Sequence, residues 1–262
     1  MLKSKINFNN LFILALLVFS MSSCSTQDRI VGSGPIVEEA FDMQSFDGIH
    51  LDCSADIFVK QGDRQEVVVR GNANIIERLK RDVVNGVWRV DLMRGNYRFN
   101  ELTIFVTVPN FNSMTIDGSG DVEFEAINTN AMQIKIDGSG DVTFQEGLTT
   151  DELKILIDGS GNINVRDLNT ALTDVRIDGS GELYLAGVSD EAKYRIDGSG
   201  DIDAFDLESD HVSVDVDASG DIKVVAKQTL NVVIDASGDV YYKGNPDIFT
   251  SIDGSGRVIN AN

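Results

Sequence analysis

The chain is poor in the residues that form disulfides, His/Cys metal centres and nucleic-acid-binding surfaces. Its 262 residues include two cysteines, two histidines, three prolines and one tryptophan. So few His and Cys side chains leave little material for a metal centre of that kind. Only 22 Lys and Arg residues stand against 42 Asp and Glu residues, which gives a net charge of −20. Because proteins bind phosphate backbones with Lys and Arg, this balance argues against a nucleic-acid partner.

The first 23 residues have the pattern of a bacterial lipoprotein signal peptide. Lys3 and Lys5 precede the apolar run Leu11–Phe19, which is too short to span a bilayer. A Met-Ser-Ser-Cys sequence then resembles a lipobox that is cleaved before Cys24, so Cys24 would carry a lipid anchor in the membrane. Because Ser25, and not Asp, follows the cysteine, we expect an outer-membrane lipoprotein on either the cell surface or the periplasmic face. An ordinary secretory signal is the alternative.

Lipidation of Cys24 leaves Cys53 as the only other cysteine, which excludes an internal disulfide. Cys53 lies in a degenerate copy of the repeat described next. We therefore expect a small, buried and unreactive thiol there.

An acidic, glycine-containing motif recurs eight times in the second half of the chain. The core unit reads apolar-x-apolar-Asp-Gly-Ser-Gly-Asp-apolar-x-apolar, with Ala218 and Ala236 replacing the first glycine in two copies and Asn162, Glu182 and Arg257 replacing the second aspartate in three. Apolar residues alternate on both sides of the motif, which predicts a strand, a turn and a second strand. The leading aspartates form a predicted structural turn column: Asp117, Asp137, Asp158, Asp178, Asp197, Asp217, Asp235 and Asp253.

Two topologies fit this unit, an antiparallel meander and a parallel solenoid. A meander would place successive turns at opposite edges, whereas the same turn here recurs once per unit and the other connections vary. We therefore predict an all-β fold, a right-handed parallel β-helix of about eight coils of ~20 residues over residues 114–262. A weaker apolar position predicts a third, looser wall at Leu148, Leu168, Val188, Leu207 and Ala226.

The Asp-Gly-Ser-Gly corner suggests a role for each of its residues. We expect the second glycine, which is present in all eight copies, to adopt a positive φ. We expect the leading aspartate to accept a hydrogen bond from the backbone N–H two residues on, as in an Asx turn. A calcium ladder on the stacked carboxylates is the alternative, helped by a second, irregular acidic column that begins at Asp121 and Asp141. Turn stabilisation without any metal or other cofactor is the preferred interpretation.

Residues 24–113 are less regular and are predicted to form a linker followed by a capping and early-coil segment. Leu51–Val59 echoes the repeat and could form an early coil. Residues 74–83 have the pattern of a short helix capped by Asn74, and Asn85-Gly86 is typical of a tight hairpin. The first coil of a solenoid exposes unpaired edge groups, so a cap is needed at this end.

One basic and aromatic cluster in this segment is a candidate ligand patch, because such residues are common in binding hot spots. Its members are Trp88, Arg89, Arg94, Tyr97 and Arg98. The alternative interpretation is that Trp88 packs under the cap.

Several motifs resemble one known family. They are Phe46-Asp47-Gly48-Ile49, Ser54-Ala55-Asp56-Ile57, Val106-Thr107-Val108-Pro109 and the serial Asp-Gly-Ser-Gly-Asp turns. Together they are similar to the putative auto-transporter adhesin, head GIN domain family, β-helical exported proteins typical of Bacteroidetes. The resemblance covers roughly residues 40–262. It implies a fold and a surface or periplasmic address, and it brings no functional residues with it.

The function expected from these features is that of a non-catalytic binding or adhesion module. A rigid, acidic β-helical surface would be presented to a glycan or protein ligand. A polysaccharide-active enzyme is an alternative, but no copy of the repeat carries the local break that an active site needs, and no catalytic residues are predicted. A structural envelope protein that associates end to end is a second alternative, since Ile252, Val258 and Asn260 of the last coil have no obvious lid.

Overall fold

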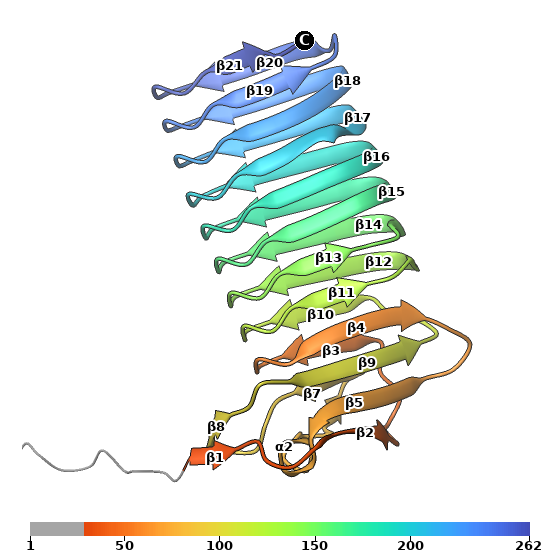
Figure 1. The fold of residues 1–262 in the computed structure, drawn as a ribbon. Coiled ribbons are helices and arrows are strands. Elements are labelled where there is room, and N and C mark those ends of the chain that lie inside the picture. Colours follow the sequence, from red (N-terminus) through yellow and green to blue (C-terminus); the bar gives the residue numbers. More distant parts are fainter. Residues whose placement is uncertain (1–28) are drawn as a thin grey trace, which may run out of the picture.

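Residues 29–262 are described by the structure, which is a computed structural model. The predicted signal peptide (residues 1–23) and the lipidation site Cys24 lie outside these residues. Figure 1 shows the chain wound into a stack of coils, with the N-terminal elements at one end of the stack and the C-terminus at the other.

The repeats form parallel coils that share one register. Met114 lies opposite Ile134, and Ile134 lies opposite Ile155. This confirms the parallel β-helix and excludes the meander; the coils form a β-solenoid of about seven turns. Its strands are β10 (Ser113–Ile116), β11 (Val122–Phe124), β12 (Ile127–Ile136), β13 (Val142–Phe144), β14 (Leu148–Ile157), β15 (Ile163–Ile177), β16 (Leu183–Ile196), β17 (Ile202–Val216), β18 (Ile222–Ile234), β19 (Val240–Lys243), β20 (Asp247–Ile252) and β21 (Val258–Asn260).

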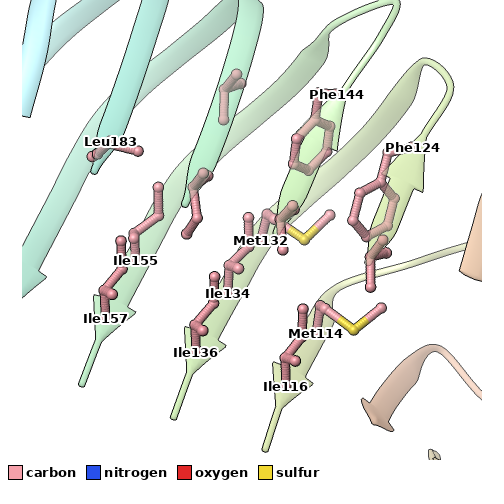
Figure 2. Packing of buried hydrophobic residues seen from close by; sticks show 14 of the residues in the cluster. Met114, Ile116, Phe124, Met132, Ile134, Ile136, Phe144, Ile155, Ile157 and Leu183 are labelled. Atoms are coloured by element: carbon pink, nitrogen blue, oxygen red, sulfur yellow. The ribbon is translucent and has the colours of Figure 1, made fainter. Parts of the chain in front are cut away.

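Like residues stack on like inside the solenoid, so the core consists of columns. Figure 2 shows Ile116, Ile136 and Ile157 at matching positions of successive coils. The rings of Phe124 and Phe144 stack with centroids 4.5 Å apart. Each such buried side chain contributes about 1.5–3 kcal/mol relative to an exposed one. No single coil could bury these residues alone, so the stack supplies the core.

The looser third wall is real at four of its five predicted positions. Leu148, Leu168, Leu207 and Ala226 are buried, but Val188 is 47% exposed. Gly187 takes the place of Val188 in the register, opposite Leu168 and Leu207. The prediction for Val188 is wrong because the strand register shifts by one residue just before Gly187, which turns the Val188 side chain outward.

The corner glycines are required for a close approach, and not for a positive φ. Positive φ values occur instead at the second bend of the coil, in Gly147, Asp167, Gly187 and Gly244. At the Asp-Gly-Ser-Gly corner, a Cβ on Gly181 would lie 2.1 Å from the carbonyl oxygen of Gly161 in the coil below. The same collision, at 1.9–2.2 Å, recurs at the second glycine of every copy. The predicted strained dihedral is therefore wrong, and contact between backbones explains the glycines.

Hydrogen bonding at the first glycine position varies along the stack, and two copies carry alanine there. In a regular coil, the N–H groups of Asp178 and Gly179 both donate to the carbonyl oxygen of Ile157, at 2.8 and 3.0 Å. At Ala218 and Ala236, only the N–H of the preceding aspartate keeps this bond in the described part of the chain. The corner at Gly254 shows the same single bond, from the N–H of Asp253 to the carbonyl oxygen of Ile234 at 2.8 Å, so the change does not depend on the Cβ of alanine.

The second acidic column, which follows each turn, ties one coil to the next. The N–H of Asp141 donates to Oδ1 of Asp121 at 2.9 Å, and the N–H of Asn162 donates to Oδ1 of Asp141 at 2.7 Å. The same link recurs along the column, from Glu182 to Asn162, Asp221 to Asp201, Asp239 to Asp221 and Arg257 to Asp239. Charge-assisted bonds of this type are about twice as strong as neutral ones.

The leading aspartates have a different environment from the one predicted. Across residues 29–262, none of the eight accepts a hydrogen bond from the backbone N–H two residues on, so the Asx turn is wrong. The corner is held by backbone bonds between coils, such as the one from the N–H of Asp137 to the carbonyl oxygen of Ile116 at 2.9 Å. The carboxylates of the turn column are thus free to contact other side chains.

The first coils are stacked out of sequence order. The half-copy formed by β3 (Gly48–Leu51) and β4 (Asp56–Gln61) pairs in parallel with β10 and β11, which come later in the chain. On its other side it pairs with β7 (Val87–Val90) and β9 (Leu102–Val108), which form a lower, irregular coil. The chain therefore winds one coil, adds a coil beneath it, and then continues upward.

The end of the stack is closed by an antiparallel extension. Strand β5 (Glu66–Asn72) pairs antiparallel with β9, and β2 (Ile36–Phe41) pairs antiparallel with β5. The short helix α2 (Ala73–Ile76) packs buried Ile75 and Ile76 against this end. The remaining strands are β1 (Arg29–Val31), β6 (Val83–Val84) and β8 (Asn96–Arg98).

Two predictions for the capping segment have different outcomes. The hairpin is confirmed, since β6 and β7 are antiparallel and the turn residues Asn85 and Gly86 have φ values of 52° and 80°. The predicted helix over residues 74–83 shrinks to one turn, and Asn74 does not cap it. The Asn74 side chain instead accepts a hydrogen bond from the N–H of Ser33 and donates one to the carbonyl oxygen of Val31. These two bonds anchor the segment that contains β1.

The two glycines of one corner are expected to differ in their response to alanine. Gly181→Ala would push a Cβ against a carbonyl oxygen and the Cγ2 methyl of Ile157, 2.9 Å away, and should cost about 1–3 kcal/mol. A Cβ on Gly179 would also lie close to a backbone oxygen, 2.0 Å from that of Gly159, but two coils already carry alanine at this position, so Gly179→Ala should cost only about 1 kcal/mol. Urea unfolding midpoints measure both; equal losses would contradict this division of roles.

The second acidic column is expected to matter more for stability than the turn column. Asp141→Ala removes the acceptor of the Asn162 N–H and should cost about 1.5–3 kcal/mol, whereas Asp141→Asn keeps an acceptor oxygen and should cost much less. Asp137→Ala removes only an exposed contact with Lys135 and should cost about 0–1 kcal/mol. Thermal unfolding of the three variants gives the comparison, and a larger loss for Asp137→Ala would contradict it.

Candidate binding groove

An exposed pair of aromatic rings marks the outer face of the sheet near the N-terminal end. Phe58 on β4 and Phe105 on β9 are directly paired across the strands, and their rings stack with centroids 5.4 Å apart. They are 38% and 39% exposed. Because Ile57, Val59, Ile104 and Val106 take the inward positions, the pleat forces both phenylalanines outward.

Strands β2, β5, β9, β4 and β11 build a groove around this pair. The row Val68, Phe105, Phe58 and Glu123 runs across four neighbouring strands. The groove has a volume of about 470 Å³, within the usual range for a small-ligand site. Its polar lining includes Glu38, Lys60, Glu66, Thr107, Glu123, Glu125 and Gln145.

Negative charge dominates the rim of the groove. Glu66 pairs with Arg64 at 2.6 Å, and Glu123 accepts a hydrogen bond from Gln145 at 3.3 Å. Within residues 29–262, neither Glu38, Glu123 nor Glu125 takes part in an ion pair. An apolar aromatic floor with unpaired carboxylates at its edges is a surface able to bind another molecule.

The structure gathers the eight leading aspartates on one edge of the solenoid. Figure 1 shows their turns stacked along one side. Several carboxylates pair with basic residues two positions earlier in the chain: Lys135 with Asp137 at 2.6 Å, Arg176 with Asp178 at 2.6 Å, and Arg195 with Asp197 at 2.9 Å. These bases lie in one outward row, in which Leu156 separates Lys135 from Arg176, so their charge offsets part of the repulsion within the turn column.

The pKa values of the turn column follow this pairing. The hydrogen bond from Arg195 lowers the pKa of Asp197, and the charges of Arg195 and Arg176 add to the effect. Burial raises the pKa of Asp158, and the nearby carboxyl of Asp178 raises it further. The column is therefore electrostatically uneven, and the basic row, which the sequence analysis did not identify, is what stabilises its charged members.

His50, Asp52 and Asp117 form a small cluster at the first complete corner. His50 Nε2 lies 2.8 Å from Oδ2 of Asp117 and 3.2 Å from Oδ1 of Asp52. Arg89 also pairs with Asp52. His50 occupies the same row as the bases of later coils. In this coil, His50 therefore contacts the leading aspartate Asp117 in the way that Lys135, Arg176 and Arg195 contact the leading aspartates of later coils.

The predicted basic and aromatic patch is not assembled as one surface. Trp88 is fully buried, stacks at a tilt on Phe46 and donates from Nε1 to the carbonyl oxygen of Lys80 at 3.1 Å. The alternative interpretation, packing under the cap, is therefore confirmed for Trp88. Arg89 is engaged by Asp52, and Tyr97 is half-buried and donates to the carbonyl oxygen of Met93. Arg94 and Arg98 remain exposed near them.

The environment of Cys53 matches an unreactive thiol. It is the one free cysteine among residues 29–262, and it lies half-buried beneath Gly118. Burial raises the pKa of Cys53 to about 11, so the thiol stays protonated at neutral pH.

Sequence reasoning missed both phenylalanines of the groove, although a signal was present. In the strand segments Asp56–Gln61 and Leu102–Val108, alternate apolar residues face inward, and Phe58 and Phe105 are apolar residues in the outward phase. An aromatic residue out of phase on two strands is a sign of an exposed contact surface. Their meeting could not be foreseen, because it depends on the out-of-order coil.

The C-terminal end of the stack exposes apolar side chains. Ile248 and Ile252 continue buried core columns above Leu230 and Ile234, and they are 40% and 45% exposed. Phe249 is 61% exposed on the outer face of the same strand. No helix within residues 29–262 is both long and apolar enough to cross a membrane.

Solved structures with the same fold come from Parabacteroides species. A Parabacteroides distasonis protein described as a putative lipid binding protein is 28% identical, with a TM-score of 0.83, and the alignment covers 89% of this chain and all of that one. A putative adhesin from the same species has a TM-score of 0.85 at 23% identity, over 89% of this chain and all of the other. A putative adhesin from Parabacteroides merdae has a TM-score of 0.83 at 20% identity, over 90% and 100%.

A search among curated proteins gives no match. The family model described as "Putative auto-transporter adhesin, head GIN domain" matches residues 45–146 and again residues 142–246, which together span well over half of the chain. Its two matches divide the solenoid into a first part with the out-of-order coil and a second part of regular coils. The chain therefore belongs to the putative auto-transporter adhesin, head GIN domain family.

Proposed function

We propose that the protein is a non-catalytic binding module of the cell envelope, held at the membrane by lipidated Cys24. The groove between β5 and β11 binds the ligand. The single observation that carries this proposal is the exposed, stacked pair Phe58 and Phe105 within a ring of carboxylates. Exposure of two adjacent aromatic rings is costly in water, so a ligand that covers them gains apolar contact.

The family and its structural relatives support a binding role over a catalytic one. The relatives are described as putative adhesins or as a putative lipid binding protein. A protein, a glycan and a lipid are therefore the ligand classes to compare. The regular coils keep one register from β12 to β16, apart from the shift at the second bend, so they offer a rigid support. A polysaccharide-active enzyme remains the catalytic alternative, and turnover of a polysaccharide by the purified protein would favour it.

The metal-free form is the one we propose to be functional. Lys135, Arg176 and Arg195 already supply counter-charge to the turn column, which reduces the need for calcium there. A calcium ladder would require these bases to move. An unchanged melting temperature on addition of a chelator or of calcium supports the metal-free form, and a rise with calcium contradicts it.

End-to-end association is a second candidate role, favoured by the exposed apolar residues of the last coil, Ile248 and Ile252. Their strand leaves one edge open to pair with another chain. Light scattering of the soluble domain at high concentration tests this role, and a strictly monomeric protein would argue against it.

The membrane tether is expected to depend on one side chain. Cys24→Ser removes the thiol that the lipid would modify, so the protein should move from the membrane fraction to the soluble fraction while keeping its fold. Fractionation with immunodetection, together with metabolic labelling by a fatty-acid analogue, measures this. Lipid anchoring would be contradicted if the Cys24→Ser variant stayed in the membrane fraction and the wild type carried no fatty-acid label.

The binding role is expected to depend on the aromatic pair. Phe58→Ala/Phe105→Ala should reduce binding at least tenfold on an array of glycans, peptides and lipid vesicles, because the aromatic floor is lost. Phe249→Ala is the matched control, since it removes an exposed phenylalanine at the far end of the solenoid. Equal binding by the double variant and the control would contradict a role for the groove, provided that both variants melt like the wild type.

A further inference from the structure

We propose that the groove binds a segment of a partner protein that is rich in Lys and Arg. This inference rests on the proposed function and names the ligand class of the same site. It is carried by three features of the groove: the exposed aromatic rings with no cation over them, the carboxylates that lack an ion pair within residues 29–262, and the small size of the depression.

Two other phenylalanine rings of this protein are covered by its own cations. The guanidinium of Arg81 lies 3.6 Å from the ring centroid of Phe41, and the ammonium of Lys243 lies 4.1 Å from that of Phe205. No such cation covers Phe58 or Phe105 within residues 29–262. A cation placed over an aromatic face is stabilised by about 0.5–2 kcal/mol, so a basic side chain from outside would complete the pattern.

The charges around the rings favour a cationic ligand. Glu38, Glu66, Glu123 and Glu125 line the groove, and among residues 29–262 Lys60 is the one basic residue that lines it. Glu66 has a partner in Arg64, which leaves three carboxylates with no ion pair in the described part of the chain. The rest of the molecule adds to this field, since the net charge is −20. Such a field attracts cations and repels phosphate groups and other anions.

The arrangement of the side chains also argues for a peptide segment. Phe105, Phe58 and Glu123 follow one another across neighbouring strands, which lie about 4.8 Å apart. Glu125 and Lys60 lie two residues further along their strands, on the same face, so the apolar row of Val68, Phe105 and Phe58 ends at acidic Glu123 and is flanked by a polar row that includes Glu66 and Thr107. A volume of about 470 Å³ accommodates a few side chains and not a folded domain. An extended segment with basic and apolar side chains fits this surface.

Other ligand classes fit the groove less well. A neutral glycan could stack on the rings, but it would leave the carboxylates without counter-charge. An acyl chain would cover the rings, but it would lie against a charged rim, where burial of unpaired carboxylates is costly. An anionic lipid would in addition be repelled. These classes are outcomes of the experiment and not parts of the proposal.

The experiment measures binding of three dye-labelled peptides of alternating sequence to the purified soluble domain. One contains lysine and leucine, the second is the same peptide with every lysine acetylated, and the third has glutamate in place of lysine. We expect the lysine peptide to bind at least tenfold more tightly than either of the others. Binding should weaken as salt is raised, because exposed charges are screened. Neutral phosphatidylcholine vesicles and a neutral glucan serve as additional probes.

Two sets of variants separate local recognition from the overall charge. Glu38→Gln/Glu123→Gln/Glu125→Gln removes three charges from the groove and should weaken binding of the lysine peptide at least tenfold. Glu152→Gln/Glu182→Gln/Glu191→Gln removes the same charge from coils outside the groove and should weaken it less than threefold. Circular dichroism melting of both variants confirms that neither change unfolds the solenoid.

The outcomes distinguish the ligand class from the site. Equal binding of the acetylated peptide, equal losses for the two triple variants, or no binding of the lysine peptide overturns the cationic segment as ligand. If vesicles or glucan bind instead, and Phe58→Ala/Phe105→Ala abolishes that binding, the groove remains the binding site and the proposed function stands. If the lysine peptide binds and the phenylalanine variant retains its full affinity, both the ligand assignment and the groove are wrong.

Discussion

The fold depends on direct contact between backbones at the Asp-Gly-Ser-Gly corner. At the second glycine of each copy, the place that a Cβ would occupy lies about 2 Å from a carbonyl oxygen of the coil below. Only glycine allows the coils to stack this closely while the strands on either side keep their pairing distance. Every copy must then follow the same path, so the same side chains repeat in columns. The sequence repeat is a direct consequence of this contact.

The same constraint explains the one corner that lacks the second glycine. In the half-copy between β3 and β4, Ala55 takes this position and is fully buried. Beneath it, the chain makes the excursion through β8 instead of a tight corner, since Leu51 pairs with Val90 and Asp56 pairs with Thr103. The lower coil therefore does not present a matching corner. Ala55 can keep its Cβ while still supporting Gly120 above.

Much of the fold could be predicted because periodicity reports directly on stacking. The repeat length, the alternation of apolar residues and the recurrence of one turn together identified a parallel β-helix, and Asn85-Gly86 identified the hairpin. The roles of individual corner residues could not be predicted in the same way. Glycine serves both for positive φ and for close approach, and a sequence does not separate these uses. Likewise, both acidic columns are present in the sequence, but only the structure shows that the column containing Asp141 accepts the backbone N–H groups.

The candidate groove was harder to predict because it lies where the repeat is broken. Phe58 and Phe105 meet only because the coil with β9 is added beneath the coil with β4. Trp88, the most conspicuous aromatic residue, is instead needed to fill the end of the core. Strands β5 and β2 extend the sheet in the antiparallel direction, so they carry none of the corner constraints of the repeats. Outward side chains there can vary without disturbing a column, which makes this end of the solenoid the place where a ligand site can form. The acidic coils of the rest of the solenoid then act at longer range. Their negative field attracts cations toward the groove, whose own lining contains few basic side chains.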